Sequence, residues 1–496
     1  MEQNVLEVLK KINAVSKKIK TPAYVVGGFV RDCVMGKSTN KDIDIVVEGS
    51  GLGFGQAFDV ALKQTGSLVE FPDFDTARYV LPSSEELPGL VVEFAGARSE
   101  QYHPTTRKPV VEKANLQADL SRRDFTVNAM AIPVAAFAGR AQLTPEKLIK
   151  KIIDPFNGQQ DLTDRLLCTP LEPDVTFSDD PLRMLRAVRF AAQLHFAIDP
   201  GVLKAIHHNR ERIKIISGER VQEELLRLLG TDEPSIGFIL LFQSGLLDLI
   251  LPEISALDGV EDMYGHQHKN NLIHTFKVVD NIAGRSENIW LRFAGLLHDI
   301  GKPATKRFVS KIGWTFHAHE HVGRKMVFAL AKRLRLSRDH TDYLAKLVRW
   351  HMQPIALMDE GVTDSAVRRL IVSLGEEIND LLILGRSDIT TGNPAKKERR
   401  LKNYEGLESR VAEVIEKDKL RAFQSPLRGE EIMALAGLKP GPTVGKIKEA
   451  IEEAILDGII PNEYEPAKEY FARIKDQYLA EAAEWERLTF SIDKTP

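Results

Sequence analysis

Two short stretches near the start of the chain combine residue types that suit phosphate and metal chemistry. The first reads Gly-Gly-Phe-Val-Arg-Asp at residues 27–32 and follows the run Ala-Tyr-Val-Val. This order predicts a strand, a glycine turn and a short helix. Free N–H groups and a positive dipole end at the start of a helix can bind a phosphate. The turn at Gly27 and Gly28 is therefore a candidate phosphate site.

The second stretch reads Asp-Ile-Asp-Ile-Val-Val at residues 42–47. Side chains alternate across a strand, so Asp42 and Asp44 are expected on one face. Hard cations such as Mg²⁺ prefer oxygen ligands, and such a pair can clamp one or two ions against a triphosphate. Glu93, in another apolar run, is the candidate third carboxylate. Either motif alone is usually a turn or solvated surface, but the two motifs together favour a catalytic site.

A second group of candidate ligands lies in the other half of the chain. Its members are His274, His298, Asp299 and Asp388. An adjacent His-Asp pair in an apolar helix, with a distant histidine and a distant aspartate, resembles the HD phosphohydrolase domain. Imidazole and carboxylate ligands suit Mn, Ni, Fe, Zn or Mg, and the sequence does not choose among them. His319 and His351 are candidates for a second ion. The alternative is a degenerate domain that serves packing and RNA support.

Length and composition set the frame for these sites. A chain of 496 residues is expected to form two to four domains. The net charge of −3 means that any nucleic-acid surface must be a local patch. Two cysteines cannot form a disulfide framework, which favours a reducing compartment. The amphipathic N-terminus does not resemble a signal peptide, and no apolar run is long enough to span a bilayer, so we expect a cytoplasmic protein without a membrane partner.

The secondary-structure pattern changes near residue 140. Before it, β-branched runs alternate with turns, and after it the pattern is helical almost throughout. We therefore predict an α+β protein in which a small mixed-sheet head precedes a mostly helical remainder. The expected domains are a nucleotidyltransferase head (1–140), a helical neck that binds nucleotide and RNA (141–260), an HD domain (261–395) and a helical tRNA-binding tail (396–496).

The opening motifs resemble the signature of the DNA polymerase β-type nucleotidyltransferases. Four further motifs follow in the order seen in class II tRNA nucleotidyltransferases and bacterial poly(A) polymerases, at residues 119–132, 154–162, 179–198 and 216–225. One departure is Asp179-Asp180, where the family usually has Glu-Asp. The second acid, which the family uses in base recognition, is retained as Asp180, so we expect little consequence.

The resemblance implies roles for individual residues. Asp42 and Asp44 would hold catalytic Mg²⁺ ions that activate the 3′-hydroxyl of RNA for attack on the α-phosphate. Asp180 and Arg183, three apart and thus expected on one helix face, would select the base. A surface ion-pair helix is the plain alternative there, and a cap or salt bridge is the alternative for Asp124. The nucleotide-binding residues implied are Gly27, Gly28, Arg31, Arg122, Arg123, Asp124, Asn128, Asp180, Arg183, Arg186 and Arg189.

The expected activity is template-independent addition of CCA to the 3′ end of tRNA from CTP and ATP. HD-domain phosphohydrolase activity would accompany it. Poly(A) addition, or addition of CC or A only, is the closest alternative, because these enzymes share the motifs. An HD phosphohydrolase with an RNA-binding head, and a structural RNA-binding protein, are alternatives of another class. In the tail, Gly441 to Gly445 could bind an RNA phosphate at a helix start or form a packing corner.

Overall fold

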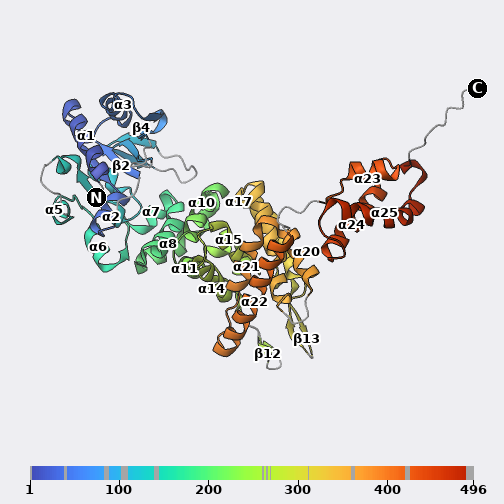
Figure 1. The fold of residues 1–496 in the computed structure, drawn as a ribbon. Coiled ribbons are helices and arrows are strands. Elements are labelled where there is room, and N and C mark those ends of the chain that lie inside the picture. The colour runs from blue at the N-terminus through green and yellow to red at the C-terminus, as the bar shows by residue number, and fades with distance from the viewer. Residues whose placement is uncertain are drawn as a thin grey trace, which may run out of the picture. The chain divides into compact units, whose positions relative to one another are not determined.

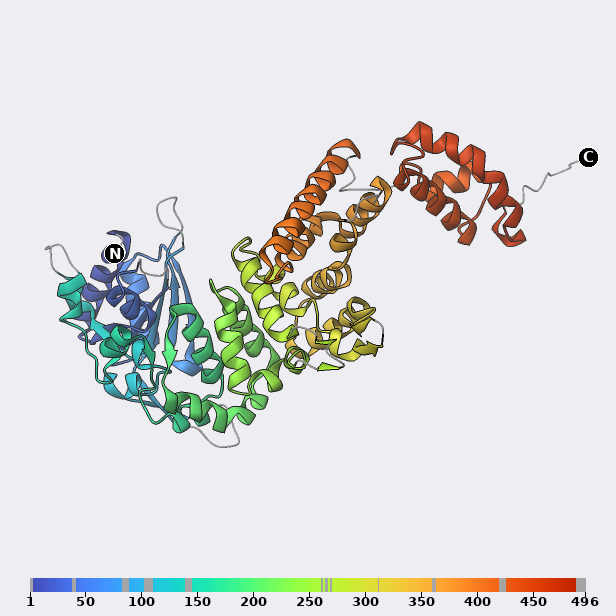
Figure 2. The same cartoon turned by 90° about the horizontal axis from the view of Figure 1, so that it is seen from below.

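The computed structural model describes most of the chain, and it divides into two compact units. The units are Met1–Ser255 with Arg333–Arg335, and Ala256–Lys332 with Leu336–Pro496. The described residues are 3–37, 42–82, 89–101, 110–138, 145–259, 262–263, 266–267, 270–310, 312–358, 363–418 and 425–487. Among them, no helix is long and apolar enough to cross a membrane. Figures 1 and 2 show a sheet in the blue N-terminal part and mainly helices thereafter.

The first unit is built on a mixed six-stranded sheet with the order β3-β4-β5-β2-β1-β8. Only the central pair β2–β5 is parallel, and every other neighbouring pair is antiparallel. The runs at residues 23–26 and 42–47 and the apolar run that contains Glu93 are confirmed as strands β1, β2 and β5. The strands of the sheet are β1 (Ala23–Val26), β2 (Asp42–Val47), β3 (Ser67–Phe71), β4 (Thr76–Val80), β5 (Val91–Gly96) and β8 (Ala131–Pro133).

Aromatic packing joins this sheet to helix α3 (Gly51–Ala61). Phe58 contacts the rings of Tyr79 and Phe94, with centroids 5.2 and 5.1 Å away. All three side chains are fully buried, which fixes the strand faces that point inward. The predicted short helix after the glycine turn is α2 (Gly28–Val34). The other elements around the sheet are α1 (Gln3–Ile19), β6 (Arg98–Gln101), β7 (Val110–Lys113), α4 (Leu116–Ser121), α5 (Pro145–Ile149) and α6 (Gly158–Asp164).

The rest of the first unit is mostly helical, and helix α8 (Leu182–Leu194) packs against both α10 and α11. One expectation is wrong here, because Asp180 and Arg183 do not share a helix. Asp180 is extended, with φ −133° and ψ 100°, and Pro181 precedes the first residue of α8. The remaining elements are α7 (Pro173–Asp179), β9 (Leu166–Leu167), β10 (Ala197–Ile198), α9 (Pro200–Asn209), α10 (Gly218–Leu229), α11 (Pro234–Gln243), α12 (Leu247–Ile250) and α13 (Pro252–Ser255).

The second unit contains a helical bundle in which α14 and α15 pack closely. A Cβ at Gly295 would lie 2.3 Å from Cδ1 of Ile282, so a larger residue at this position would require the Ile282 side chain to move. Asn270 and Asn288 cap the two helices. The elements are β11 (Asp262–Met263), β12 (His266–Gln267), α14 (Asn271–Ala283), α15 (Ile289–Leu297), α16 (Lys302–Thr305), β13 (Arg307–Val309), β14 (Gly313–Thr315), α17 (His319–Leu334), α18 (Arg338–Trp350), α19 (Gln353–Ala356), α20 (Asp364–Leu374), α21 (Ile378–Ser387) and α22 (Pro394–Asp418).

The C-terminal residues of the second unit form a small helical core of their own. It is made by α23 (Gly429–Ala436), α24 (Pro442–Leu456) and α25 (Tyr464–Glu481). The carboxylate of Glu486 accepts hydrogen bonds from the Thr443 N–H at 2.9 Å and the Thr443 hydroxyl at 3.0 Å. A side chain of the same chain thus already caps the first turn of α24. The structure therefore favours the packing corner over a phosphate grip at Gly441 to Gly445.

Candidate active site

Three carboxylates lie together where strands β2 and β5 run in parallel. Asp44 is directly opposite Glu93 in the register, and Asp42 precedes it by two residues. Asp42 and Asp44 are exposed on one face of β2, whereas Ile43 and Ile45 are buried on the other. The shared face predicted for the two aspartates is therefore confirmed, and Glu93 lies on the neighbouring strand as expected.

The carboxylates of this cluster repel one another. Although Asp44 reaches solvent, protein atoms surround much of its carboxylate, and this burial raises its pKa above the ordinary value; Asp42 adds to the effect and Arg123 opposes it. Burial also raises the pKa of Glu93, and the charge of Asp44 contributes, against the opposing charge of Arg78. Crowded oxygen ligands whose ionised forms are disfavoured are the donor set that a hard divalent cation relieves. The cluster therefore fits a metal such as Mg²⁺.

The glycine turn passes directly beside these acids. Gly27 has a φ of 69°, and a Cβ there would lie 3.3 Å from Nη1 of Arg123 and 3.5 Å from Oδ2 of Asp44. Both the backbone conformation and the close approach favour glycine at this position. Arg31, in contrast, is buried and points into the protein, where it pairs with Asp32 at 2.8 Å and donates to Asn128 Oδ1 at 3.0 Å.

Asp119, which sequence reasoning missed, positions the two arginines that follow it. Its fully buried carboxylate binds Arg122 at 2.6 Å through one oxygen and Arg123 at 3.1 Å through the other. Burial alone would raise the pKa of Asp119, but the guanidinium groups of Arg123 and Arg122 hold it below its ordinary value. The signal available in the sequence was an acid three and four residues before a pair of arginines.

Asp124 is the centre of a buried network. Its Oδ2 accepts hydrogen bonds from Arg186 at 2.9 and 2.5 Å, and its Oδ1 accepts one from Asn128 at 3.1 Å. Burial opposes ionisation, yet the Arg186 guanidinium lowers the pKa of Asp124 to about 2. The salt bridge considered as the alternative for this residue is therefore what the structure shows, and Arg186 is joined to the head through it.

An arginine pocket of about 250 Å³ brings together residues from three of the predicted motifs. Five guanidinium groups and two carboxylates line it, which suits a polyanion that also presents hydrogen-bonding groups. Sequence reasoning missed one member, Arg220, although it lies in the quoted motif at 216–225. The lining residues are Arg122, Arg123, Asp124, Asp180, Arg183, Arg186 and Arg220.

Asp180 and Arg183 both line the arginine pocket despite lying on different elements. Oδ1 of Asp180 accepts the N–H of Leu182 at 3.1 Å, and its Oδ2 lies 3.6 Å from Nη2 of Arg220. Arg183 donates to the backbone carbonyl of Arg122 at 2.6 Å. The pocket thus offers an acceptor and several donors at the start of α8.

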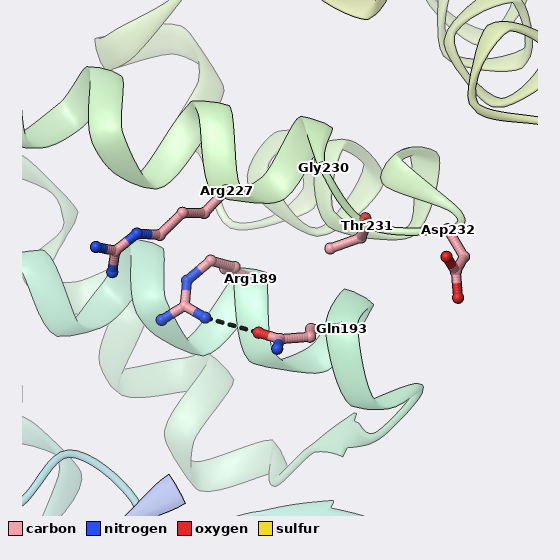
Figure 3. Close-up of a pocket in the computed structure, with 6 residues that line it drawn as sticks. All are labelled: Arg189, Gln193, Arg227, Gly230, Thr231 and Asp232. Atoms are coloured by element: carbon pink, nitrogen blue, oxygen red, sulfur yellow. Dashed lines mark hydrogen bonds between the residues drawn. The ribbon is translucent and has the colours of Figure 1, made fainter. Parts of the chain in front are cut away.

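Arg189 lies outside the arginine pocket. Its Nε binds the buried Glu224 at 2.6 Å, and its Nη1 donates to Gln193 at 2.8 Å. It lines a separate hollow of about 330 Å³. Figure 3 shows the guanidinium groups of Arg189 and Arg227 on the same side of this hollow and Asp232 at the opposite end. Arg189 therefore does not line the arginine pocket, although Glu224 joins it to Arg186, whose Nη1 lies 3.9 Å from the same carboxylate.

All six predicted ligands of the second site converge in the helical bundle of the second unit. They form two groups, His274, His298 and Asp388, and Asp299, His319 and His351. His274 Nε2 lies 2.8 Å from Asp388, and His298 Nε2 lies 3.1 Å from Asp299. His319 Nε2 lies 3.1 Å from His351 Nε2 and 3.4 Å from Asp299. The two groups are adjacent, since Asp299 reaches both.

The outer ring nitrogens of these histidines define their tautomers. Nδ1 of His298, His319 and His351 each lies 2.7–2.8 Å from a backbone carbonyl, to which it donates as N–H. The Nε2 atoms therefore point inward, and that of His298 is buried 3.1 Å from the Asp299 carboxylate. Burial lowers the pKa of His351 to about 4, which keeps its imidazole neutral. Inward lone pairs facing carboxylates fit one or two divalent cations.

Three regions of the chain are similar to known protein families. Family models match as a poly A polymerase head domain at residues 23–168, a probable RNA and SrmB-binding site of polymerase A at 195–257, and an HD domain at 271–384. The A-adding tRNA nucleotidyltransferase of Deinococcus radiodurans is 33% identical over 349 residues, or 68% of this chain and 75% of the relative. The chain belongs to the tRNA nucleotidyltransferase family.

Other tRNA nucleotidyltransferases are similar to the same degree. The CC-adding enzyme of Thermus thermophilus is 31% identical and covers 88% of this chain and 90% of its own. A multifunctional CCA protein of Pseudomonas fluorescens is 32% identical over 66% of this chain and 74% of its own. The solved Bacillus stearothermophilus CCA-adding enzyme with CTP has a TM-score of 0.66 at 22% identity, covering 97% of this chain and all 100% of that one. The predicted fold class, a mixed-sheet head with a helical remainder and an HD domain, is confirmed.

Proposed function

We propose that this nucleotidyltransferase adds CCA to the 3′ end of tRNA, with CTP and ATP as substrates. The observation that carries the proposal is the junction between the carboxylate cluster and the arginine pocket. Arg123 lies beside Gly27 and Asp44 and also lines the pocket. A triphosphate whose base enters the pocket would thus present its phosphates to the three acids.

The residues of the head then have distinct tasks in the reaction. The 3′-oxygen of tRNA attacks the α-phosphorus, the bond to the β-phosphate oxygen breaks, pyrophosphate leaves and the hydroxyl proton passes to solvent. Asp42, Asp44 and Glu93 would hold Mg²⁺, which activates the hydroxyl and neutralises phosphate charge when bound. The Gly27–Gly28 turn orients the triphosphate, and Arg122 and Arg123, held by Asp119, bind its anionic oxygens.

Protein side chains, rather than a template, would select the base. The Asp180 carboxylate is an acceptor for the exocyclic amino group that cytosine and adenine both carry, and Arg183 is a donor. Uracil and guanine present a carbonyl at the corresponding place. A carboxylate facing a carbonyl is unfavourable, and this contrast would exclude UTP and GTP.

The test is to incubate the purified protein with tRNA lacking CCA and each NTP, singly and combined, and to sequence the products. We expect two C additions with CTP, then one A, and no addition from UTP or GTP. The relatives include A-adding, CC-adding and multifunctional CCA proteins at 33%, 31% and 32% identity, so partial activity is the second candidate. Addition of only CC, only A, or a long A tail would replace the proposal with that alternative.

We further propose that the second unit is a metal-dependent phosphohydrolase. Four histidine Nε2 atoms and two carboxylates converge there in two adjacent groups, which suits hydrolysis of a phosphate ester by a metal-activated water. Phosphatase and 2′,3′-cyclic phosphodiesterase assays with Mg²⁺, Mn²⁺, Ni²⁺ and Co²⁺ test it. If no hydrolysis is detected with any of these four ions, the phosphohydrolase proposal is wrong.

We also propose that the domains end near residues 140, 260 and 395. The tail after residue 395 would bind tRNA, and the protein would be cytoplasmic. The matches at residues 23–168, 195–257 and 271–384 support a head, neck and HD order. A solved complex of a Thermotoga maritima CCA-adding enzyme with tRNA has the same fold, at a TM-score of 0.57 and 21% identity. We infer from this that tRNA is the partner of the present chain.

A further inference from the structure

The charged groups of the arginine pocket differ in how firmly they are paired. Arg122 and Arg123 are held by Asp119, at 2.6 and 3.1 Å. Arg186 has two short hydrogen bonds to Asp124, of 2.9 and 2.5 Å. The three other charged residues of the lining are Asp180, Arg183 and Arg220.

The pair of Asp180 with Arg220 is loose compared with these short contacts. The oxygen and nitrogen are 3.6 Å apart, and the two side chains are 22% and 35% exposed, so each can reach an entering ligand. Arg183 does not replace this partner, since its shortest hydrogen bond is to a backbone carbonyl at 2.6 Å. Asp180 itself is anchored on the other side, where its Oδ1 accepts the Leu182 N–H at 3.1 Å.

These contacts set the direction of the free oxygen. Because Oδ1 caps the first turn of α8, rotation of the carboxylate is restricted, and Oδ2 is the oxygen left for the pocket. Arg220 approaches Oδ2 from the first turn of α10. A cation at 3.6 Å attracts this oxygen without the geometry of a hydrogen bond, so Oδ2 keeps its capacity to accept one from a base.

We propose that Arg220 is a positioning residue for base selection: its positive charge attracts Oδ2 of Asp180 and directs this oxygen toward the amino group of cytosine or adenine. This inference rests on the proposed function, in which Asp180 reads the base. It assigns a specificity role to helix α10, which contributes no residue to the carboxylate cluster or to the base contacts proposed above.

The proposal predicts a change in selectivity rather than in the chemical step. In Arg220→Gln, we expect the KM for CTP and ATP to rise about tenfold, the size of one lost polar contact, with kcat within about threefold of the parent. Discrimination against UTP and GTP should fall about tenfold. Arg220→Lys retains the positive charge and should keep most of the discrimination.

A matched control lies on the same helix. Arg227 is 59% exposed and pairs with Glu224 at a similar distance, 3.7 Å, but does not line the arginine pocket. Arg227→Gln should leave the ratio of CTP to UTP incorporation at the parent value. Melting curves of all three variants identify any general loss of folding, which would lower kcat with every nucleotide and is not expected.

Equilibrium binding of CTP and UTP without RNA gives a second readout that needs no turnover. If Arg220→Gln binds CTP and UTP more weakly by the same factor, the arginine is a phosphate ligand and the proposal is wrong. Unchanged selectivity in this variant would also overturn it. These outcomes are distinct from failure of the proposed function, in which the parent itself would add neither C nor A to tRNA.

Discussion

At the scale of single residues, the head combines two opposite electrostatic arrangements. The cluster of Asp42, Asp44 and Glu93 is short of positive charge, and the pKa values of Asp44 and Glu93 are raised. In the network of Asp124 and Arg186 each charge has its partner, and the pKa of the acid is lowered. The first arrangement destabilises the metal-free fold and prepares a ligand site, whereas the second stabilises the fold.

Glu93→Gln tests the first arrangement. Loss of one carboxylate should raise the Mg²⁺ concentration for half-maximal nucleotide incorporation about tenfold. The melting temperature of the metal-free protein should increase by on the order of 1–2 °C, because one repulsive charge is removed. Glu112→Gln, an exposed acid on β7, is the control and should change neither. An unchanged Mg²⁺ requirement in Glu93→Gln would remove this residue from the ligand set.

Asp124→Asn tests the second arrangement through its pH dependence. The pKa of Asp124 is about 2 in the fold, below its ordinary 3.8, so its contribution to stability is present above pH 4 and is lost as the pH falls through 2. We expect the variant to be less stable at pH 7 by roughly 2 kcal/mol. Urea unfolding of both proteins should show this difference narrowing between pH 4 and pH 2. A constant difference would mean that the charge of Asp124 does not stabilise the fold.

At the scale of elements, the sequence correctly predicts the features that depend on side-chain alternation along a strand and on the position of glycine. The strand face of Asp42 and Asp44, the turn at Gly27 and the helix after it were all readable from spacing. The parallel pairing that places Glu93 opposite Asp44 joins strands about fifty residues apart, and its apolar setting only suggested it. The i,i+3 spacing of Asp180 and Arg183 predicts a shared helix, but Pro181 lies between them and the helix begins only at Leu182.

Residues that act by holding another side chain in place are harder to predict from the sequence. Asp119 and Arg220 are charged residues within the motifs at 119–132 and 216–225. The i,i+3 and i,i+4 spacing connects Asp119 with Arg122 and Arg123, whereas no spacing connects Arg220 with Asp180. The histidine cluster is easier to predict, because histidine and aspartate are uncommon in apolar helices and therefore stand out as candidate metal ligands. All six of its predicted members converge in the structure.

A prediction at this scale concerns the cap of α24. Glu486→Ala removes the carboxylate that binds the N–H and hydroxyl of Thr443 and the Ala483 N–H. The first turn of α24 then has unsatisfied donors, so its amide hydrogens should exchange several-fold faster in hydrogen-exchange mass spectrometry. Exchange in α8 is the internal control and should not change. Equal exchange in α24 of both proteins would show that the cap does not hold this helix.

At the scale of the whole molecule, the two candidate sites lie in different compact units. The carboxylate cluster and the arginine pocket lie within Met1–Ser255, and the histidine cluster lies within the unit that begins at Ala256. Each set contains enough ligands for its own cations. Neither chemistry should therefore need the ligands of the other, and damage to one site should leave the other active.

The most direct measurement is single-nucleotide incorporation from CTP into tRNA lacking CCA, run beside hydrolysis of a 2′,3′-cyclic phosphate. It compares the parent, Asp44→Ala, and the double variant His298→Ala with Asp299→Ala, each first shown to melt like the parent, because metal ligands can stabilise a fold. The account predicts that Asp44→Ala loses incorporation at least about a thousandfold, while tRNA binding, which rests on phosphate-backbone contacts, remains. The double variant should lose hydrolysis and incorporate CTP at the parental rate. Near-normal incorporation by a folded Asp44→Ala would contradict the assignment of nucleotidyl transfer to the carboxylate cluster.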